Sequence, residues 1–211
     1  MNELQTGYRE RPGRRFHGLF WVIASVSLSG CAEPPPPALP PSAAGTHEPK
    51  SPAEVYFPLQ HDTVYQYATQ NRSGVPGLLV MQVQRDAQAA TLTTAGKVQQ
   101  VEIRADGIYN QEGFYLLRLP FEPGNRWRGK HGSIEITQVD STVKVEAGHF
   151  EHCLTTTETG GAEHQRHTVV TTFCPNVGIV SLLVEAQTAS GIDRERAELR
   201  YFGPRVDVDA L

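Results

Sequence analysis

The chain has 211 residues, of which 39% are hydrophobic and 20% charged, and its formal net charge is −4. This composition is typical of a globular protein, and the length is sufficient for a sizeable core. The chain contains no Lys/Arg-rich block and no basic residues interleaved with aromatics. Neither nucleic acid nor an anionic membrane surface is therefore an electrostatically favoured partner.

The first thirty residues have the parts of an export signal. Four arginines precede an apolar run, Leu19–Ser29, which is too short to span a bilayer. The run ends in Leu28-Ser29-Gly30-Cys31, which resembles the lipobox of bacterial lipoproteins. The resemblance implies that the Cys31 thiol receives a diacylglycerol, that cleavage precedes Cys31, and that the new amino group is acylated, usually with a fatty acid such as palmitate. An ordinary secretory signal, or an apolar helix that contains a chance cysteine, is the alternative.

This interpretation predicts a signal peptide over residues 1–30 and attachment to a membrane through acyl chains. Each buried methylene contributes about 0.8 kcal/mol, and two or three chains give stable anchoring. Because Ala32 rather than Asp follows Cys31, the resemblance implies the outer membrane of a diderm host, on its periplasmic or surface side. The Arg14-Arg15 pair leaves twin-arginine export open beside the general secretory route. Removal of four arginines and two glutamates takes the net charge of the mature chain to −6.

Proline dominates the segment that follows. Residues 31–53 include Pro34–Pro37 and the pair Pro40-Pro41, which favour an extended polyproline II conformation. This segment is predicted to be a Pro-rich tether, reaching at most about 60 Å at ~3.1 Å per residue. A proline-rich recognition site is the alternative. Residues 54–211 are predicted to form one globular domain.

The domain is predicted to be mainly β. Apolar residues alternate with polar ones along Val101–Ala105, Ile134–Ile136 and Ala197–Tyr201, and Val180, Leu182, Val184 and Ala186 share one face. Turn-forming pairs such as Asp106-Gly107 separate these runs. No stretch of ten residues shows helical spacing. We therefore expect a single antiparallel meander sheet, curved or folded into a half-barrel.

A second resemblance spans most of residues 55–185. The segments Val55–Leu59, Leu116–Trp127, Val143–Phe150 and Cys174–Val180 resemble the ordered signature of a group of uncharacterised bacterial lipoproteins with β-rich envelope domains. This chain differs from the group in the first strand. Members of the group often have Gly and Trp there, whereas this chain has Asp62-Thr63-Val64-Tyr65. The resemblance implies a fold and a cell-envelope location but no activity.

Two cysteines remain once Cys31 is lipidated. In an exported protein, Cys153 and Cys174 are expected to form a disulfide. Two free thiols or a metal pair are the alternatives. A hairpin centred between Glu163 and His164 would place the two cysteines directly opposite, with Cα atoms about 4.4 to 6.8 Å apart. A tight turn at Gly160-Gly161 would instead place Cys153 opposite Thr168.

The sequence offers little catalytic or metal-binding chemistry. His149 and His152 diverge on a regular strand, and His164 and His167 lie at a hairpin tip. Ser181 lacks the glycines and helix of a nucleophile elbow. The acid pairs Glu146 with Glu151 and Asp193 with Glu195 fit solvated strand edges and turns. We expect no metal, no cofactor and no enzymatic activity.

The sequence is compatible with three functions. The first is a lipid-anchored interaction or structural module of the envelope, with a protein partner. The second is a carrier or sensor that holds a hydrophobic ligand on a concave sheet face. The aromatic residues around the central turn are the candidates for that face, with a plain core role as the alternative: Phe114, Tyr115, Phe121 and Trp127. The third is a hydrolase whose site the motifs do not show.

Overall fold

The computed structural model describes residues 51–162, 166–189 and 191–205. The predicted signal peptide, Cys31 and most of the tether lie outside these residues. The described chain forms one short helix and twelve strands. They are α1 (Pro52–Tyr56), β1 (Thr63–Gln70), β2 (Pro76–Asp86), β3 (Ala89–Thr94), β4 (Lys97–Arg104), β5 (Gly107–Asn110), β6 (Tyr115–Arg118), β7 (Arg126–Arg128), β8 (Gly132–Val145), β9 (Gly148–Gly160), β10 (His167–Cys174), β11 (Gly178–Thr188) and β12 (Gly191–Pro204).

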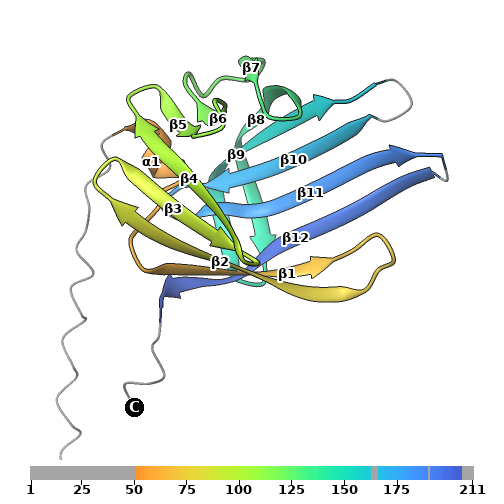
Figure 1. The fold of residues 1–211 in the computed structure, drawn as a ribbon, viewed down its shortest axis with the longest axis horizontal. Coiled ribbons are helices and arrows are strands. Elements are labelled where there is room, and N and C mark those ends of the chain that lie inside the picture. Colours follow the sequence, from red (N-terminus) through yellow and green to blue (C-terminus); the bar gives the residue numbers. More distant parts are fainter. Residues whose placement is uncertain (1–50, 163–165, 190, 206–211) are drawn as a thin grey trace, which may run out of the picture. The chain divides into compact units, whose positions relative to one another are not determined.

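All twelve strands belong to one antiparallel sheet, as the alternation predicted. The chain runs from β1 outwards to β6, crosses to β7 at the other edge, and returns to β12, which pairs with β1. The sheet is nearly closed and barrel-like (Figure 1). The predicted turn-forming pair Asp106-Gly107 lies at the turn from β4 to β5, with Gly107 as the first residue of β5.

The inner face of the sheet carries the core. On β1, Thr63, Tyr65 and Tyr67 are buried, while the residues between them are half-buried. Tyr67 pairs with Leu199 of β12 and Leu79 of β2, so the same face continues across the strands. Side chains at every second position of a strand point to the same face of the sheet. This alternation determines which residues are buried in the core.

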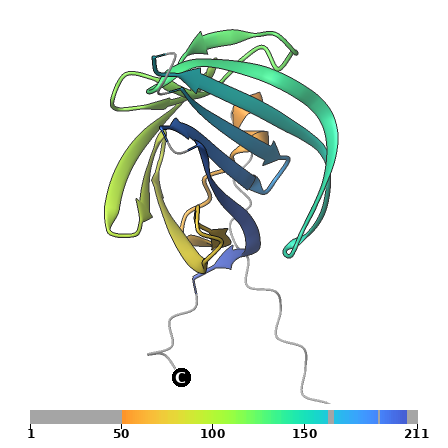
Figure 2. The same cartoon turned by 90° about the vertical axis from the view of Figure 1, so that its right-hand side faces the viewer.

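Helix α1 and the segment after it fill part of the space inside the curve. Ala53, Phe57 and Leu59 are at most 1% exposed. Phe57 packs against Phe173 of β10, with ring centroids 6.0 Å apart. Gly178, at the start of β11, has φ +108° and approaches the Phe57 ring so closely that a Cβ would lie 3.1 Å from it. Viewed towards the hairpin tips, the strands arch around α1 (Figure 2).

A buried ion pair ties α1 to the sheet. The Arg85 guanidinium of β2 donates to Glu54 Oε1 at 2.7 Å, and the two side chains are 7% and 1% exposed. Arg85 also donates to the carbonyls of Pro58 and Ala87, at 3.1 Å and 3.2 Å. A carboxylate is costly to bury without an opposite charge, and Arg85 supplies that charge to Glu54.

Side chains close the gap between the two edge strands, β6 and β7. These strands share no backbone ladder. The Trp127 indole of β7 donates to the Tyr115 carbonyl of β6 at 3.1 Å. On the neighbouring turns, the side-chain amide of Asn125 donates to the Pro120 carbonyl at 2.8 Å, and Lys130 forms an ion pair with Glu112. Closure of the sheet at this seam therefore rests on particular side chains.

The predicted disulfide is confirmed: Cys153 is bonded to Cys174. In the β9–β10 hairpin, Leu154 pairs with Phe173 and Thr168 with Thr159, so the wider of the two predicted loops is the one observed. The two Cα atoms are 4.2 Å apart, slightly closer than expected. Directly opposed antiparallel residues approach to about 4.5 Å where they share no hydrogen bond, which accounts for this close spacing.

The β8–β9 hairpin bends because its ladder carries three register shifts between Ile136 and Val143, two with the extra residue on β8 and one with it on β9. Its tip reaches β12, where the Ala147 amide donates to the Leu199 carbonyl at 3.1 Å. Phe150 packs against Phe202 of β12, which also stacks on Tyr65. Bulges add local twist and bend a strand, and here they fold a long hairpin over one part of the sheet.

We predict that Arg85→Met lowers the free energy of unfolding by about 3 to 5 kcal/mol, because the buried Glu54 carboxylate loses the guanidinium that donates to it. Urea denaturation measures this change. Arg126→Met is the matched control: Arg126 and its partner Glu135 are 66% and 33% exposed, and we expect a loss within about 1 kcal/mol. Equal effects of the two substitutions would contradict the structural role given to the buried pair.

Candidate ligand-binding groove

An open groove of 360 Å³ lies where β1, β2, β11 and β12 meet at their hairpin ends. Its size falls within the usual range for ligand pockets, about 300 to 1,000 Å³. Apolar residues make up about half of the lining. The lining residues are Thr69, Gln70, Asn71, Val75, Pro76, Gly77, Leu79, Leu182, Val184, Glu195, Arg196 and Ala197.

The groove follows from unequal strand lengths. β2, β11 and β12 have 11, 11 and 14 residues, whereas β5, β6 and β7 have 4, 4 and 3. The short strands cannot cover the inner face of the long ones along their full length. Leu79, Leu182 and Val184 lie on that inner face yet stay only half-buried. Figure 1 shows the long hairpins extending past β3–β7.

Local hydrogen bonds and one ion pair shape the rim of the groove. Asn71 Oδ1 accepts from the amides of Ser73 and Val75, at 3.0 Å and 2.9 Å, and so fixes the β1–β2 turn. Arg72 of that turn pairs with Asp193 of β12 at 3.3 Å. The two hairpins that flank the groove are thereby linked across its end.

Tyr67 separates the groove from the filled part of the core. It is the next inward residue of β1 after Thr69 and is 4% exposed. Its hydroxyl donates to the Ile179 carbonyl of β11 at 3.1 Å. Burial raises the pKa of Tyr67 well above the ordinary value, and the neighbouring Tyr65 raises it further, so the hydroxyl stays neutral. The inner end of the groove is therefore uncharged.

Two other hollows are poorer candidates. One, of 440 Å³, is lined only by consecutive residues of the β7–β8 hairpin, Arg126–Ser133, and so lies within a single turn. The other, of 720 Å³, lies against the outer face of β1, β2 and β12, and its lining includes the Arg200–Glu146 ion pair. Neither combines an apolar lining with walls from several strands.

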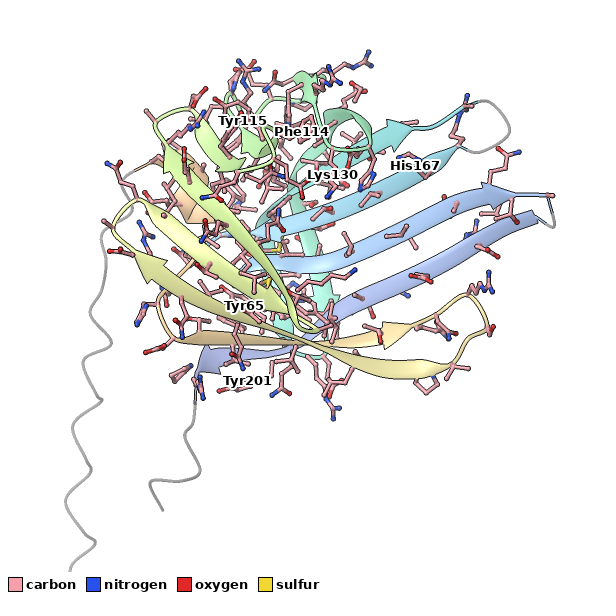
Figure 3. All side chains as sticks on the ribbon, viewed as in Figure 1. Tyr65, Phe114, Tyr115, Lys130, His167 and Tyr201 are labelled. Atoms are coloured by element: carbon pink, nitrogen blue, oxygen red, sulfur yellow. A yellow bond between two sulfur atoms is a disulfide. The ribbon has the colours of Figure 1, made fainter. Side chains whose placement is uncertain are left out.

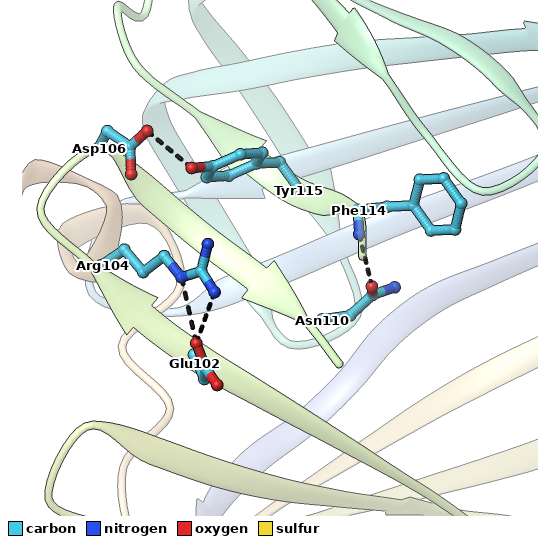
Figure 4. Close-up of polar contacts among 6 residues, drawn as sticks. All are labelled: Glu102, Arg104, Asp106, Asn110, Phe114 and Tyr115. Atoms are coloured by element: carbon cyan, nitrogen blue, oxygen red, sulfur yellow. Dashed lines mark hydrogen bonds and ion pairs between the residues drawn. The ribbon is translucent and has the colours of Figure 1, made fainter. Parts of the chain in front are cut away.

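The predicted aromatic residues do not line the groove. Trp127 is in the core, and Phe121 packs edge-on against Tyr56. Tyr115 belongs to a network at the β4–β6 end of the sheet, in which its hydroxyl donates to Asp106 Oδ2 at 2.7 Å (Figure 4). The backbone amide of Phe114 donates a hydrogen bond to Asn110 Oδ1 at 2.9 Å. The core alternative describes three of these residues better, because Trp127 is buried and Tyr115 and Phe121 pack against the core.

In the same network Arg104 donates to Glu102 at 2.8 Å and 3.1 Å, and its guanidinium lies 3.6 Å from the centre of the Tyr109 ring. The hydrogen bond to Glu102 raises the pKa of Arg104, and Tyr115 adds to this effect. Each charge in the cluster already has a partner. We therefore assign the cluster to the structure of this face rather than to a site.

The candidate histidines lie apart. His149 and His152 are exposed on β9, and His164 lies outside the described residues. His167, labelled in Figure 3, is half-buried at the start of β10, with its ring 5.4 Å from that of His131. Its Nε2 is buried without a hydrogen-bond partner. No three metal-ligating side chains converge within the described part of the chain.

The remaining candidates of the sequence take structural positions. Ser181 is half-buried in β11, opposite Glu198 and Thr172. Asp193 pairs with Arg72, whereas Glu195 lies in the groove lining. Cys31 lies outside the described residues. Within residues 51–162, 166–189 and 191–205, no helix is long and apolar enough to cross a bilayer.

Comparison with known proteins gives no family. No family model matches the chain, and no curated protein matches it. Among solved structures, it is similar to a candidate exported protein with a YmcC-like fold from Bacteroides fragilis, at 15% identity and a TM-score of 0.48, over 68% of this chain and 96% of that one. It is also similar to a candidate lipoprotein from Parabacteroides distasonis, at 12% identity and a TM-score of 0.43, over 71% and 98%.

One titratable pair outside the groove stands out. Asp140 on β8 and His152 on β9 both have φ +56° at the bulged part of the hairpin, and their side chains are joined through Oδ1 and Nδ1. The hydrogen bond to Asp140 and its negative charge raise the pKa of His152 above the ordinary 6.5. The pair therefore stabilises the fold fully below pH 6.5, and this contribution is lost as the pH rises through the raised pKa.

We predict that Asp140→Asn brings the pKa of His152 down towards 6.5, since the substitution removes the charge and the carboxylate acceptor. An NMR titration of the imidazole ring signals measures this pKa directly. Glu102→Gln is the control, because Glu102 bonds to Arg104 on another part of the sheet. An unchanged His152 pKa in Asp140→Asn would contradict the pairing.

Proposed function

We propose that the protein is a lipid-anchored envelope protein whose β domain binds a hydrophobic ligand, a single-chain amphiphile, in the groove between β1, β2, β11 and β12. The observation that carries this proposal is the half-buried aliphatic inner face at Leu79, Leu182 and Val184. Nearer to α1, the inner-face residues Tyr65, Tyr67 and Leu199 are buried. An apolar chain laid on this face would gain about 0.8 kcal/mol for each methylene it buries.

The groove lies at one end of the domain. Figure 1 shows α1 and the end of β12 on one side of the domain, and the β1–β2 and β11–β12 tips on the other. The groove between these two hairpins therefore opens at the end of the domain opposite α1.

The composition of the groove favours binding over catalysis. Its lining contains no serine, histidine or cysteine among the described residues, and its titratable side chains are Glu195 and Arg196. A nucleophile with an adjacent base, or an acid with a base, is therefore not assembled there. We propose a carrier or sensor role without enzymatic activity.

A protein-contact role is the second candidate, and the outer sides of the same hairpins favour it. Leu78 and Ile192 are 57% and 63% exposed, and both face away from the groove. A partner that delivers or accepts the ligand could dock on these side chains. Loss of a partner contact in Leu78→Ser with unchanged ligand affinity would separate this role from ligand binding.

We predict that Cys31→Ser leaves uncleaved precursor and abolishes labelling by a fatty-acid probe, because the thiol is the proposed acceptor of the lipid. We also expect the unsubstituted protein to fractionate with outer-membrane markers, as Ala32 implies. Labelling that persists in the variant would exclude the lipidation. Fractionation with inner-membrane markers would exclude the outer-membrane location alone.

We predict that the mature chain, residues 31–211, binds the neutral probe N-phenyl-1-naphthylamine saturably, and that Val184→Glu weakens binding at least tenfold by placing a carboxylate on the apolar face. Fluorescence titration measures the affinity, and thermal denaturation verifies the fold. Val98→Glu is the control, because Val98 is 64% exposed on β4 and outside the groove. Absence of saturable binding, or equal binding by the two variants, would contradict the proposal.

A further inference from the structure

The charges around the groove are unevenly paired. Four carboxylates lie on β11 and β12 next to it, and three of them have an arginine partner. Asp193 pairs with Arg72 at 3.3 Å, Glu185 with Arg194 at 2.6 Å, and Glu198 with Arg196. The fourth, Glu195, forms no ion pair or hydrogen bond with any side chain in the described part of the chain.

Glu195 is also the carboxylate that faces the groove. It lies directly opposite Val184 in the β11–β12 ladder, and Leu182 pairs with Ala197 one step further in. Residues opposed in this way share a face, so Glu195 continues the inner apolar row towards the hairpin end. The other charged residue of the lining, Arg196, has its guanidinium engaged by Glu198. The net charge presented at the mouth of the groove is therefore negative.

We propose that Glu195 binds the cationic head of an amphiphile whose chain lies on Leu79, Leu182 and Val184, so that the ligand class is a single-chain amine or quaternary ammonium compound. This inference rests on the proposed ligand groove. A positive head near Glu195 gains a Coulomb attraction, while the carboxylate of a fatty acid at the same place is repelled. The charge thus selects among ligands whose chains bind equally well.

The test uses three ligands with the same chain: dodecylamine, 1-dodecanol and dodecanoate, each competing with N-phenyl-1-naphthylamine on the mature chain at pH 7 and low salt. We expect dodecylamine to bind most tightly and dodecanoate least. We expect Glu195→Gln to weaken the binding of dodecylamine about twofold to fivefold, as for an exposed ion pair. The same substitution should strengthen the binding of dodecanoate and leave the affinity for 1-dodecanol unchanged. The preference for the amine shrinks in 1 M salt.

Glu151→Gln is the matched control, since it removes one exposed carboxylate from β9, away from the groove. If all three ligands bind equally, or if Glu195→Gln and Glu151→Gln behave alike, the role of Glu195 is excluded while the groove proposal stands. If 1-dodecanol and the neutral probe fail to bind, the groove proposal itself is excluded. A preference for dodecanoate would overturn the ligand class.

Discussion

The buried pair between Glu54 and Arg85 is the interaction on which the arrangement of this domain depends. A twelve-stranded sheet that curves almost into a closed ring encloses more space than its own inward side chains fill. The segment from α1 to Leu59 fills part of that space, and the ion pair, with side chains 1% and 7% exposed, fixes α1 against β2. Because the segment is short, it fills only one part of the interior. The inner face at the other end, where the long strands extend past the short ones, therefore remains accessible and forms the groove.

Two further constraints keep the sheet in this shape. At the seam, Trp127 bridges to the Tyr115 carbonyl in place of a backbone ladder, so closure does not require β6 and β7 to pair. In the β9–β10 hairpin, the disulfide holds the strand ends that lie near Phe57. Closing a loop of this length stabilises a domain by about 3 kcal/mol, a substantial fraction of a typical total of about 5 to 15 kcal/mol. Both constraints lie on the filled side, which leaves the hairpins around the groove held by the Arg72–Asp193 pair and the Asn71 turn.

Much of the fold could be predicted from the sequence because its signals are local. The alternation at Val101–Ala105 and Val180–Ala186 identified strands and their inner faces, and the position of Cys153 relative to Cys174 identified the hairpin register. Helix α1 was not predicted, since its five residues are too few to show a helical period. The pairing of Glu54 with Arg85 joins residues 31 positions apart and leaves no local pattern. The sequence pattern does not point to the groove, because it gives the face of a strand but not which strands are long enough to remain uncovered.

Methyl NMR of the mature chain during titration with 1-dodecanol tests the central claim most directly, since it reports where a chain lies without assuming its head group. We expect saturable shifts for the methyl groups of Leu79, Leu182 and Val184, with Leu154 and Leu199 of the filled core unchanged. Shifts confined to the outward-facing Leu78, Val98 and Ile192, or shifts centred on the core around α1, would contradict this claim.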